Sequence, residues 1–174
     1  ARGLQIASSA ARALGGGSPA KAARMLLGVI GGVGEVTGAA SGAQLGSGKR
    51  AWAVAGDGGF MMVCQSLSTL ARNKLNAVVF VMSNAVYAIE QVYVDITSFE
   101  PGPKHTFDTF DLLPQWDYLA LAKAYGAKGF RVTTVDELNH ALLALLALKD
   151  QPALVEVVIP QKDLPRQMYR LGIE

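Results

Sequence analysis

The sequence is short of several residues and patterns, and each shortage excludes a class of protein. It has one cysteine, Cys64, so no disulfide can form within the chain, and a reducing, cytoplasmic setting is expected. The 16 Lys and Arg residues against 14 Asp and Glu give a net charge of only +2, with no basic cluster, so no nucleic-acid partner is expected. No apolar run reaches the length of a membrane span; residues 25–33 fall short of it, so no membrane partner is expected either.

The first residues differ in composition from the rest of the chain. Residues 1–23 are predicted to be helical, and no acidic residue precedes Glu35. This composition resembles a transit peptide, but a basic surface helix is the favoured interpretation. We therefore divide the chain into a helical N-terminal segment, residues 1–30, and one compact domain, residues 31–174, as a 51% hydrophobic composition allows.

Two apolar segments with a helical pattern between them predict a βαβ unit. Residues 51–55 and 76–82 are short and apolar, so both are expected to be buried strands. Between them, residues 60–72 place apolar side chains at the spacing of one helix face. Asp57 follows the first strand and Asn84 follows the second. Because ligands of such sheets bind at the carboxyl ends of the strands, both side chains are expected to face the same crevice.

These residue types suit a diphosphate bound through Mg²⁺. This ion prefers oxygen ligands, usually one or two from the protein and the rest from phosphates and water. Gly58 and Gly59 would let the backbone approach the phosphates closely, and the helix after them would present free N–H groups. The alternative is an ordinary turn in which Asp57 caps the next helix. Asn84 at the matching strand end favours the metal site.

The remainder of the chain alternates between strand and helix signals. Residues 129–133 and 153–159 are predicted strands, and residues 116–125 are a predicted helix. A capping box from Thr134 to Glu137 opens a further helix. The predicted fold is therefore α/β, with a parallel sheet and helices on both faces.

Two further segments are unusual. Residues 96–113 form a long loop with several prolines and phenylalanines, and such a loop is uncommon unless it has a function. We expect it either to line or close over a substrate pocket, or to be a packed surface loop. The predicted helix over residues 34–45 has glycines at four-residue spacing, which favours close packing on the sheet or on a partner helix over packing within a membrane.

From about residue 31 to about residue 165 the chain resembles the diphosphate-binding (PP) domain of thiamine diphosphate enzymes. It is most similar to the group of pyruvate, indolepyruvate and phenylpyruvate decarboxylases. The resemblance implies that the side chains of Asp57 and Asn84 and the backbone carbonyl of Val86 bind Mg²⁺. It also implies that Gly58 and Gly59 hold phosphate oxygens. The chain departs from the family pattern at Ser83, Val86 and Gly59, where Asn, Gly, and Ser or Ala are usual.

The resemblance also assigns residues around the reactive end of thiamine diphosphate. The carbonyl of Gly31 would accept a hydrogen bond from the 4′-amino group, and Val33 would be the apolar wedge that bends the cofactor. Ile89 and Glu90 match the pair that decarboxylases place beside the reacting carbon. Glu90 is therefore the candidate catalytic residue for substrate orientation and proton transfer, and Ile89 is the apolar wall beside it.

The function that the resemblance implies is decarboxylation of a small 2-oxo acid by a thiamine diphosphate-dependent lyase. In the family, a separate pyrimidine-binding domain supplies an activating glutamate, and a chain of this length has no room for it. We therefore expect a partner domain or subunit, a hetero-oligomer, and an inactive isolated chain. Two alternatives stay open: a carboligase of the acetolactate synthase type, and a catalytically silent domain that binds cofactor or partner.

Overall fold

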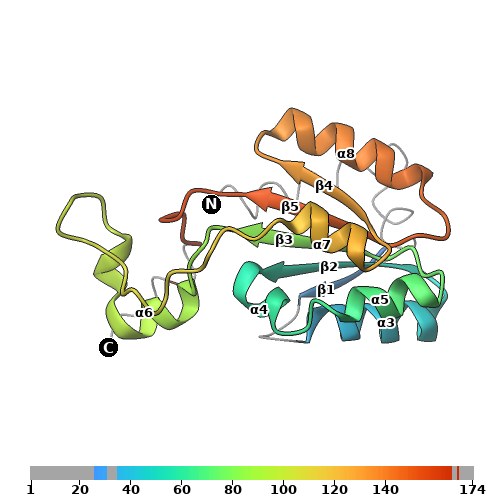
Figure 1. The fold of residues 1–174 in the computed structure, drawn as a ribbon, viewed down its shortest axis with the longest axis horizontal. Helices are drawn as coiled ribbons and strands as arrows, with labels where there is room; N and C mark the ends of the chain where they lie inside the picture. Colours follow the sequence, from blue (N-terminus) through green and yellow to red (C-terminus); the bar gives the residue numbers. More distant parts are fainter. Residues whose placement is uncertain (1–25, 31–34, 166–167, 169–174) are drawn as a thin grey trace.

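The computed structural model describes residues 26–30, 35–165 and 168 (Figure 1). The predicted helix over residues 1–23 lies outside these residues, as do Gly31 and Val33. The described elements, in chain order, are β1 (Leu26–Ile30), α3 (Val36–Ser47), β2 (Arg50–Gly56), α4 (Asp57–Met61), α5 (Ser66–Arg72), β3 (Val78–Ser83), α6 (Ala88–Asp95), the 3-10 helix η1 (Ile96–Phe99), α7 (Tyr118–Ala124), β4 (Lys128–Val132), α8 (Val135–Ala147) and β5 (Ala153–Val158).

The strands form one five-stranded sheet in the order β1-β2-β3-β5-β4, and every neighbouring pair is parallel. The two strands of the predicted βαβ unit, β2 and β3, lie side by side, with Gly56 paired to Met82. The carboxyl ends of the strands consequently meet at one edge of the sheet (Figure 1). Strand β1 comes from residues that precede position 31, so the sheet extends into the segment that the sequence analysis kept separate.

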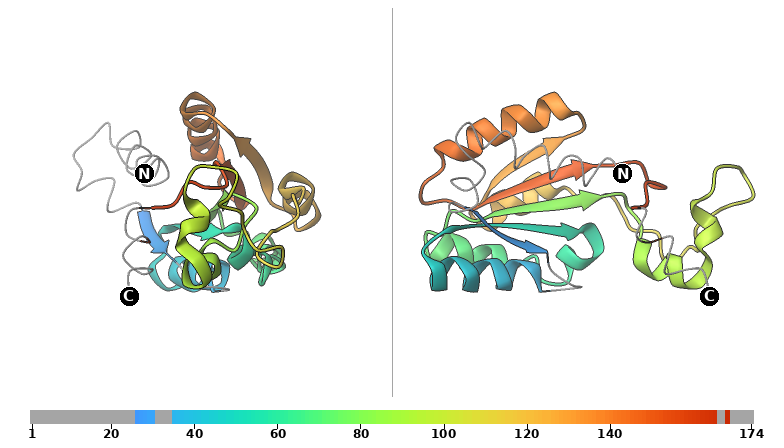
Figure 2. Two further views of the ribbon diagram at one scale, coloured as in Figure 1. Left: turned by 90° about the vertical axis from the view of Figure 1, so that its left-hand side faces the viewer. Right: turned by 180° about the vertical axis from the view of Figure 1, so that it is seen from behind.

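Helices cover both faces of the sheet, as predicted (Figure 2). Side chains of successive strand residues point to opposite faces, and in β3 this alternation sends Val79 and Val81 to one face and Val78 and Phe80 to the other. The first face packs against α3, α4, α5 and α7. The second face packs against α8. This helix begins with the predicted capping box, in which the side chains of Thr134 and Glu137 each accept a hydrogen bond from the backbone N–H of the other residue.

One predicted helix is divided in the structure. The pattern over residues 60–72 predicted a single helix after the glycines, but α4 begins at Asp57 and ends at Met61, and α5 begins at Ser66. Between them the chain continues through short-range backbone bonds, from Val63 N to Phe60 O and from Ser66 N to Val63 O. These bonds join residues three apart, as in a 3-10 turn, and change the direction of the chain. Because Phe60 nevertheless stays in the core, the spacing of apolar residues could not reveal the break.

The glycines of α3 do not face the sheet, which was one of the two arrangements predicted for them. Gly38 and Gly42 lie on the exposed side of α3, and no atom lies within 4 Å of where a Cβ would stand on either. The sheet is instead contacted by the other side of the helix, where Val36 and Ala40 are buried. The prediction that these glycines pack on the sheet is therefore wrong. The alternative prediction, that they pack on a partner helix, is not tested.

Residues 88–113, here called the α6 projection, extend beyond the carboxyl ends of the strands and away from the sheet (Figures 1 and 2). The projection has a small core of its own in which Val92 and Phe99 pack with Leu164. The fully buried Gln91 accepts a hydrogen bond from the backbone N–H of Asp108 at 2.9 Å and thus ties the helix to the loop. The predicted irregular segment is therefore an organised loop packed on α6.

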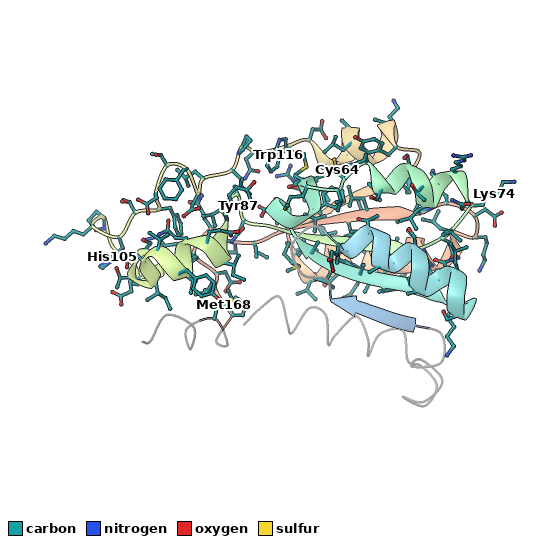
Figure 3. All side chains as sticks on the ribbon, turned by 90° about the horizontal axis from the view of Figure 1, so that it is seen from below. Cys64, Lys74, Tyr87, His105, Trp116 and Met168 are labelled. Carbon is teal, nitrogen blue, oxygen red and sulfur yellow. The ribbon has the colours of Figure 1, made fainter. Side chains whose placement is uncertain are left out.

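Lys162, which follows β5, binds the loop of the α6 projection through its ammonium group. Its ammonium donates to the backbone carbonyls of Glu100 at 2.7 Å and His105 at 2.6 Å, and lies 5.8 Å from the centre of the Phe107 ring. His105 lies near the far end of this loop (Figure 3).

Within the residues described here, no helix is long and apolar enough to cross a bilayer.

Candidate functional site

Asp57 and Asn84 lie at the same edge of the sheet and are directly joined. One carboxylate oxygen of Asp57 accepts hydrogen bonds from the backbone N–H groups of Asn84 at 3.0 Å and Ala85 at 2.7 Å. The other accepts from the N–H of Gly58 at 2.9 Å. These bonds exist because β2 and β3 are parallel neighbours that end together. The two positions therefore meet at one edge of the sheet, and the expectation that both side chains face one crevice stays a prediction.

The carboxylate of Asp57 is almost completely buried, with only 3% of the residue exposed. Burial raises its pKa above the ordinary value, and the backbone N–H groups of Ala85, Gly58 and Asn84 oppose that rise because they stabilise the charged form. The N–H of Asp57 itself also stabilises the charged form. The carboxylate is therefore held in one orientation by backbone groups at the edge where a cation could bind it.

The side-chain amide of Asn84 is oriented by the segment after β5. Its Nδ2 donates to the carbonyl of Gln161 at 3.5 Å, so the amide oxygen is directed away from Gln161. The side chain of Gln161 in turn donates to the carbonyl of Ala85 at 3.4 Å. Asn84 itself is buried. Together with Asp57 it offers a carboxylate and an amide oxygen at adjoining strand ends.

The loop after β3 turns sharply at Ala85, whose φ of +57° lies in the left-handed region. The next residue, Val86, does not share that backbone conformation, so a valine is accommodated there without strain. The Val86 carbonyl accepts from the N–H of Ala88 at 2.8 Å. It could also bind a cation, since a carbonyl oxygen has two lone pairs.

Gly58 has a packing reason to be glycine. A Cβ at this position would stand 2.2 Å from Cε1 of Tyr87, so the Tyr87 ring lies directly against the α-carbon. Tyr87 precedes α6 and is located where the α6 projection meets the sheet (Figure 3). The contact joins the loop after β2 to the loop after β3. The predicted close approach of phosphates to Gly58 and Gly59 stays a prediction.

The structure does not bring the residues predicted around the reactive end of the cofactor into one enclosed site. Ile89 is 39% exposed and Glu90 is exposed, both in the first turn of α6. Within the described residues, neither side chain is enclosed, so Ile89 does not wall off Glu90 from solvent. Gly31 and Val33 lie outside the described residues, and their predicted contacts with the cofactor stay untested.

Three buried polar residues near this edge escaped the sequence analysis as site candidates. Asp111 and Glu156 are 2% and 1% exposed, and each has at least one carboxylate oxygen without a hydrogen-bond partner. The hydroxyl of Tyr118 is likewise buried and unpaired, and burial, followed by the charges of Asp57 and Glu156, raises its pKa. One signal was available: Glu156 interrupts an otherwise apolar strand. Asp111 and Tyr118 carried no such signal, because their burial depends on distant segments.

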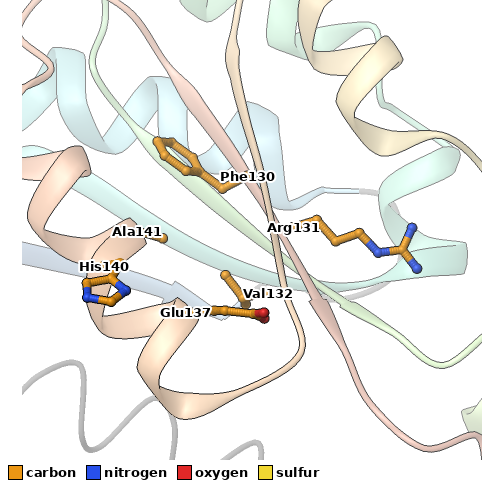
Figure 4. Close-up of a pocket in the computed structure, with 6 residues that line it drawn as sticks. All are labelled: Phe130, Arg131, Val132, Glu137, His140 and Ala141. Atoms are coloured by element: carbon orange, nitrogen blue, oxygen red, sulfur yellow. The ribbon is translucent and has the colours of Figure 1, made fainter.

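A shallow pocket elsewhere in the molecule is unrelated to this edge (Figure 4). It lies between the edge strand β4 and α8 and is separated from β2 by β5 and β3. Glu137, which lines it, is already engaged by the backbone N–H groups of Thr133 and Thr134 in the capping box. Among the residues that the structure describes, no group of three or more His, Cys, Asp or Glu side chains could hold a metal ion.

The comparisons with known proteins agree with this geometry. Residues 8–157 match the family model described as thiamine pyrophosphate enzyme, C-terminal TPP binding domain. Over 149 residues, the chain is 35% identical to a pyruvate decarboxylase of Aspergillus fumigatus, which covers 82% of this chain and 24% of that protein.

Two solved structures share the fold. A thiamine diphosphate-dependent 4-hydroxybenzoylformate decarboxylase of Rhodococcus jostii matches with a TM-score of 0.59 and 28% identity, covering 70% of this chain and 22% of the other. A benzoylformate decarboxylase of Polynucleobacter necessarius matches with a TM-score of 0.58 and 31% identity, covering 74% and 23%. The chain thus spans about a quarter of the length of each of these relatives.

Proposed function

Since the chain belongs to the thiamine pyrophosphate enzymes, as their C-terminal TPP-binding domain, we propose that it binds the diphosphate of this cofactor through Mg²⁺ in a 2-oxo acid decarboxylase. The observation that carries the proposal is the direct link between Asp57 and the backbone of Asn84 and Ala85 at the carboxyl edge of the sheet. Ligands of open α/β sheets bind at this edge.

The donor set suits the proposed metal. Asp57 offers a carboxylate oxygen, Asn84 an amide oxygen and Val86 a backbone carbonyl, all of them hard oxygen ligands of the kind that Mg²⁺ prefers. A buried carboxylate is itself a reason to expect a cation, because burying a charge without a counter-charge is costly. Gly58 and Gly59 would lie next to the phosphates.

When bound, thiamine diphosphate supplies a nucleophilic carbon and an electron sink for the loss of CO₂ from a 2-oxo acid. The chain's own contribution is to bind and orient. Glu90 would orient the substrate and move a proton near the reacting carbon, and Ile89 would contribute apolar surface next to it. Gly31 and Val33 would contact the aminopyrimidine ring.

We further propose that a pyrimidine-binding domain, on a partner or elsewhere in a longer polypeptide, completes the site. Three features support this. The chain spans about a quarter of the length of its relatives. Ile89 and Glu90 are exposed, whereas a site closed to solvent would require another domain to bury them. The outer side of α3 also presents small residues and the exposed Leu45. A substrate site closed by a second domain would exclude water from the reacting carbon.

The binding half of the proposal is tested by isothermal titration of the chain with thiamine diphosphate in the presence and absence of Mg²⁺. Binding that requires Mg²⁺ and is abolished by Asp57→Ala is expected. Asp150→Ala, which removes an exposed carboxylate far along the chain, is the matched control and should bind normally. Equal binding by the Asp57→Ala variant would refute the metal site.

The reaction is tested by adding a pyrimidine-binding domain from a related decarboxylase and supplying a labelled 2-oxo acid. An aldehyde product supports decarboxylation. A hydroxyketone would instead identify a carboligase, and binding without any product would identify a silent domain. Tight binding and turnover by the chain alone would refute the need for a partner.

A further inference from the structure

Tyr87 lies between the sheet and the α6 projection (Figure 3). It directly precedes α6, and its backbone carbonyl accepts a hydrogen bond from the N–H of Gln91 at 3.0 Å, which closes the first turn of that helix. Its own N–H donates to the carbonyl of Asp111, in the loop of the projection, at 2.8 Å. The backbone of Tyr87 is therefore part of the projection.

The ring of Tyr87 contacts the other region of the molecule. A Cβ atom added to Gly58 would stand 2.5 Å from Cδ1 of the ring and closer still to Cε1, whereas Cβ atoms in proteins essentially never come within 3.0 Å of another atom. The ring thus lies directly on the glycine backbone. Gly58 is buried in α4, the short helix whose Phe60 side chain is fully buried in the core. The ring therefore packs on backbone that the core of the sheet holds in place.

The loop that leads into α6 is otherwise held by bonds along one short stretch of backbone. The N–H of Ala85 donates to the Asp57 carboxylate at 2.7 Å, and the carbonyl of Ala85 accepts from the N–H of Leu113 at 2.9 Å. An antiparallel bridge joins the next residue, Val86, to Leu112. These bonds fix where α6 begins, but bonds along a single stretch leave the tilt of the following helix open. A side-chain contact outside that stretch can fix the tilt.

We propose that Tyr87 is a positioning residue, whose ring on Gly58 sets the tilt of α6 and thereby the place of Glu90 relative to the loop that binds the diphosphate. The inference rests on the proposed function, since it concerns Glu90 and the bound cofactor. Glu90 lies in the first turn of α6, so a shift of Tyr87 is passed on to it. The contact also restricts position 58 to glycine without any phosphate, because a side chain there would displace the ring.

The first test needs neither cofactor nor turnover. Amide hydrogen exchange is measured in the full chain, at Gln91 and the residues that follow it in α6. In Gly58→Ala the added Cβ displaces the ring, and exchange at these amides should accelerate at least about 10-fold although the change lies in a different element. Gly56→Ala is the matched control, because a Cβ on Gly56 meets no atom within 4 Å, and it should leave exchange in α6 as in wild type. Unchanged exchange in Gly58→Ala, or equal acceleration in both variants, would overturn the proposal.

Removal of the ring should reverse the effect of Gly58→Ala on stability. With Tyr87 present, the change should lower the melting temperature by about 3 °C or more, because the ring and the Cβ cannot both keep their places. In a Tyr87→Ala background the added Cβ no longer meets the ring. Alanine is preferred to glycine in a helix, so the same change should then raise the melting temperature by up to about 3 °C. An equal loss in both backgrounds would overturn the proposal.

The kinetic test uses the chain assembled with a pyrimidine-binding domain. Tyr87→Ala should lower kcat by roughly 10–100-fold, because misplacement of a catalytic group by about 1 Å has effects of this size, while KM for the 2-oxo acid changes little. Tyr87→Phe keeps the ring carbons that contact Gly58 and should recover most of the loss. An equal loss in the Phe variant would assign the effect to the hydroxyl group and overturn the role of the ring. Wild-type kcat in Tyr87→Ala would overturn it as well.

These measurements separate the inference from the proposed function. Failure of the wild-type chain to bind thiamine diphosphate would refute the proposed function. The hydrogen-exchange and melting measurements are made without cofactor, and they would still decide whether the contact between Tyr87 and Gly58 holds α6 in place.

Discussion

The sheet and the α6 projection are stabilised in different ways. In the sheet, buried aliphatic side chains fill both faces and a continuous parallel ladder joins five strands. In the projection, a small core is supplemented by polar bonds from Gln91 and Lys162, and large apolar side chains remain exposed; these are Ile89, Tyr93, Val94, Phe110 and Leu112. The sheet is therefore stabilised mainly by apolar packing and strand pairing, whereas the projection depends more on a few polar bonds and presents apolar surface for further contacts.

The difference matters because the candidate site lies where the two regions meet. Asp57 begins α4 at the carboxyl edge of the sheet, Glu90 and Asp111 lie in the projection, and the contact between Gly58 and Tyr87 joins the two regions. Changes in the sheet should unfold the whole protein. Changes in the projection should alter the site while leaving the fold intact.

The largest effect is expected from a cavity in the sheet. Leu154→Ala, at a buried position of the interior strand β5, should lower the free energy of unfolding by about 3 kcal/mol. Phe99→Ala in the projection should lower it by less than about 1 kcal/mol, because the projection can lose its structure locally. Urea unfolding with a global probe measures both. Similar losses in the two variants would show that the regions unfold as one unit.

A smaller, pH-dependent effect is expected at Glu156 in β5. Burial raises the pKa of Glu156; the Arg131 charge 3.7 Å away and the nearby Ser83 hydroxyl oppose that rise. A raised carboxyl pKa means that the folded state binds the proton more tightly, so stability falls as the pH rises through the folded-state pKa. Glu156→Gln removes this loss and should be more stable than wild type by about 1 kcal/mol at neutral pH.

At a pH below the ordinary carboxyl range, both proteins carry a neutral side chain at position 156 and the difference should disappear. Urea unfolding over a series of pH values provides the measurement. A difference that stays constant with pH would assign the effect to packing instead of charge.

The smallest effect on global stability is expected from Lys162→Met. This change removes two hydrogen bonds to the loop carbonyls of Glu100 and His105 but keeps most of the aliphatic stem. Amide hydrogen exchange in residues 100–107 should accelerate at least about 10-fold, while the midpoint of global unfolding stays within about 0.5 kcal/mol of wild type. Lys149→Met, which removes a single exposed bond to Leu146, is the matched control. Unchanged exchange would show that the loop does not depend on Lys162.

Much of the fold could be predicted from local patterns. The apolar runs that became β2, β3 and β5, and the capping box of α8, are signals carried by neighbouring residues. The division between α4 and α5 could not be predicted, since the same apolar spacing serves one helix or two with a tight turn between them. The exposure of Gly38 and Gly42 also depended on which side of α3 meets the sheet.

For the candidate site, too, local patterns indicated some residues and not others. Asp57 and Asn84 could be identified because each directly follows a strand, and parallel neighbours bring such positions together. The burial of Asp111 and Tyr118 and the openness of Glu90 could not be identified. They depend on contacts between segments that are 20 or more residues apart, for which the sequence has no periodic signal.

By itself, the sequence determined the alternation of strands and helices, the family, and the two polar residues at the strand ends, because these follow from periodicity and from motifs within short windows. Only the tertiary structure decided that the carboxylate of Asp57 is bonded to the backbone after β3, that Tyr87 lies against Gly58, and that Asp111 is buried. The physical reason is that burial and electrostatic environment arise from distant segments, whose approach depends on the packing of the whole sheet.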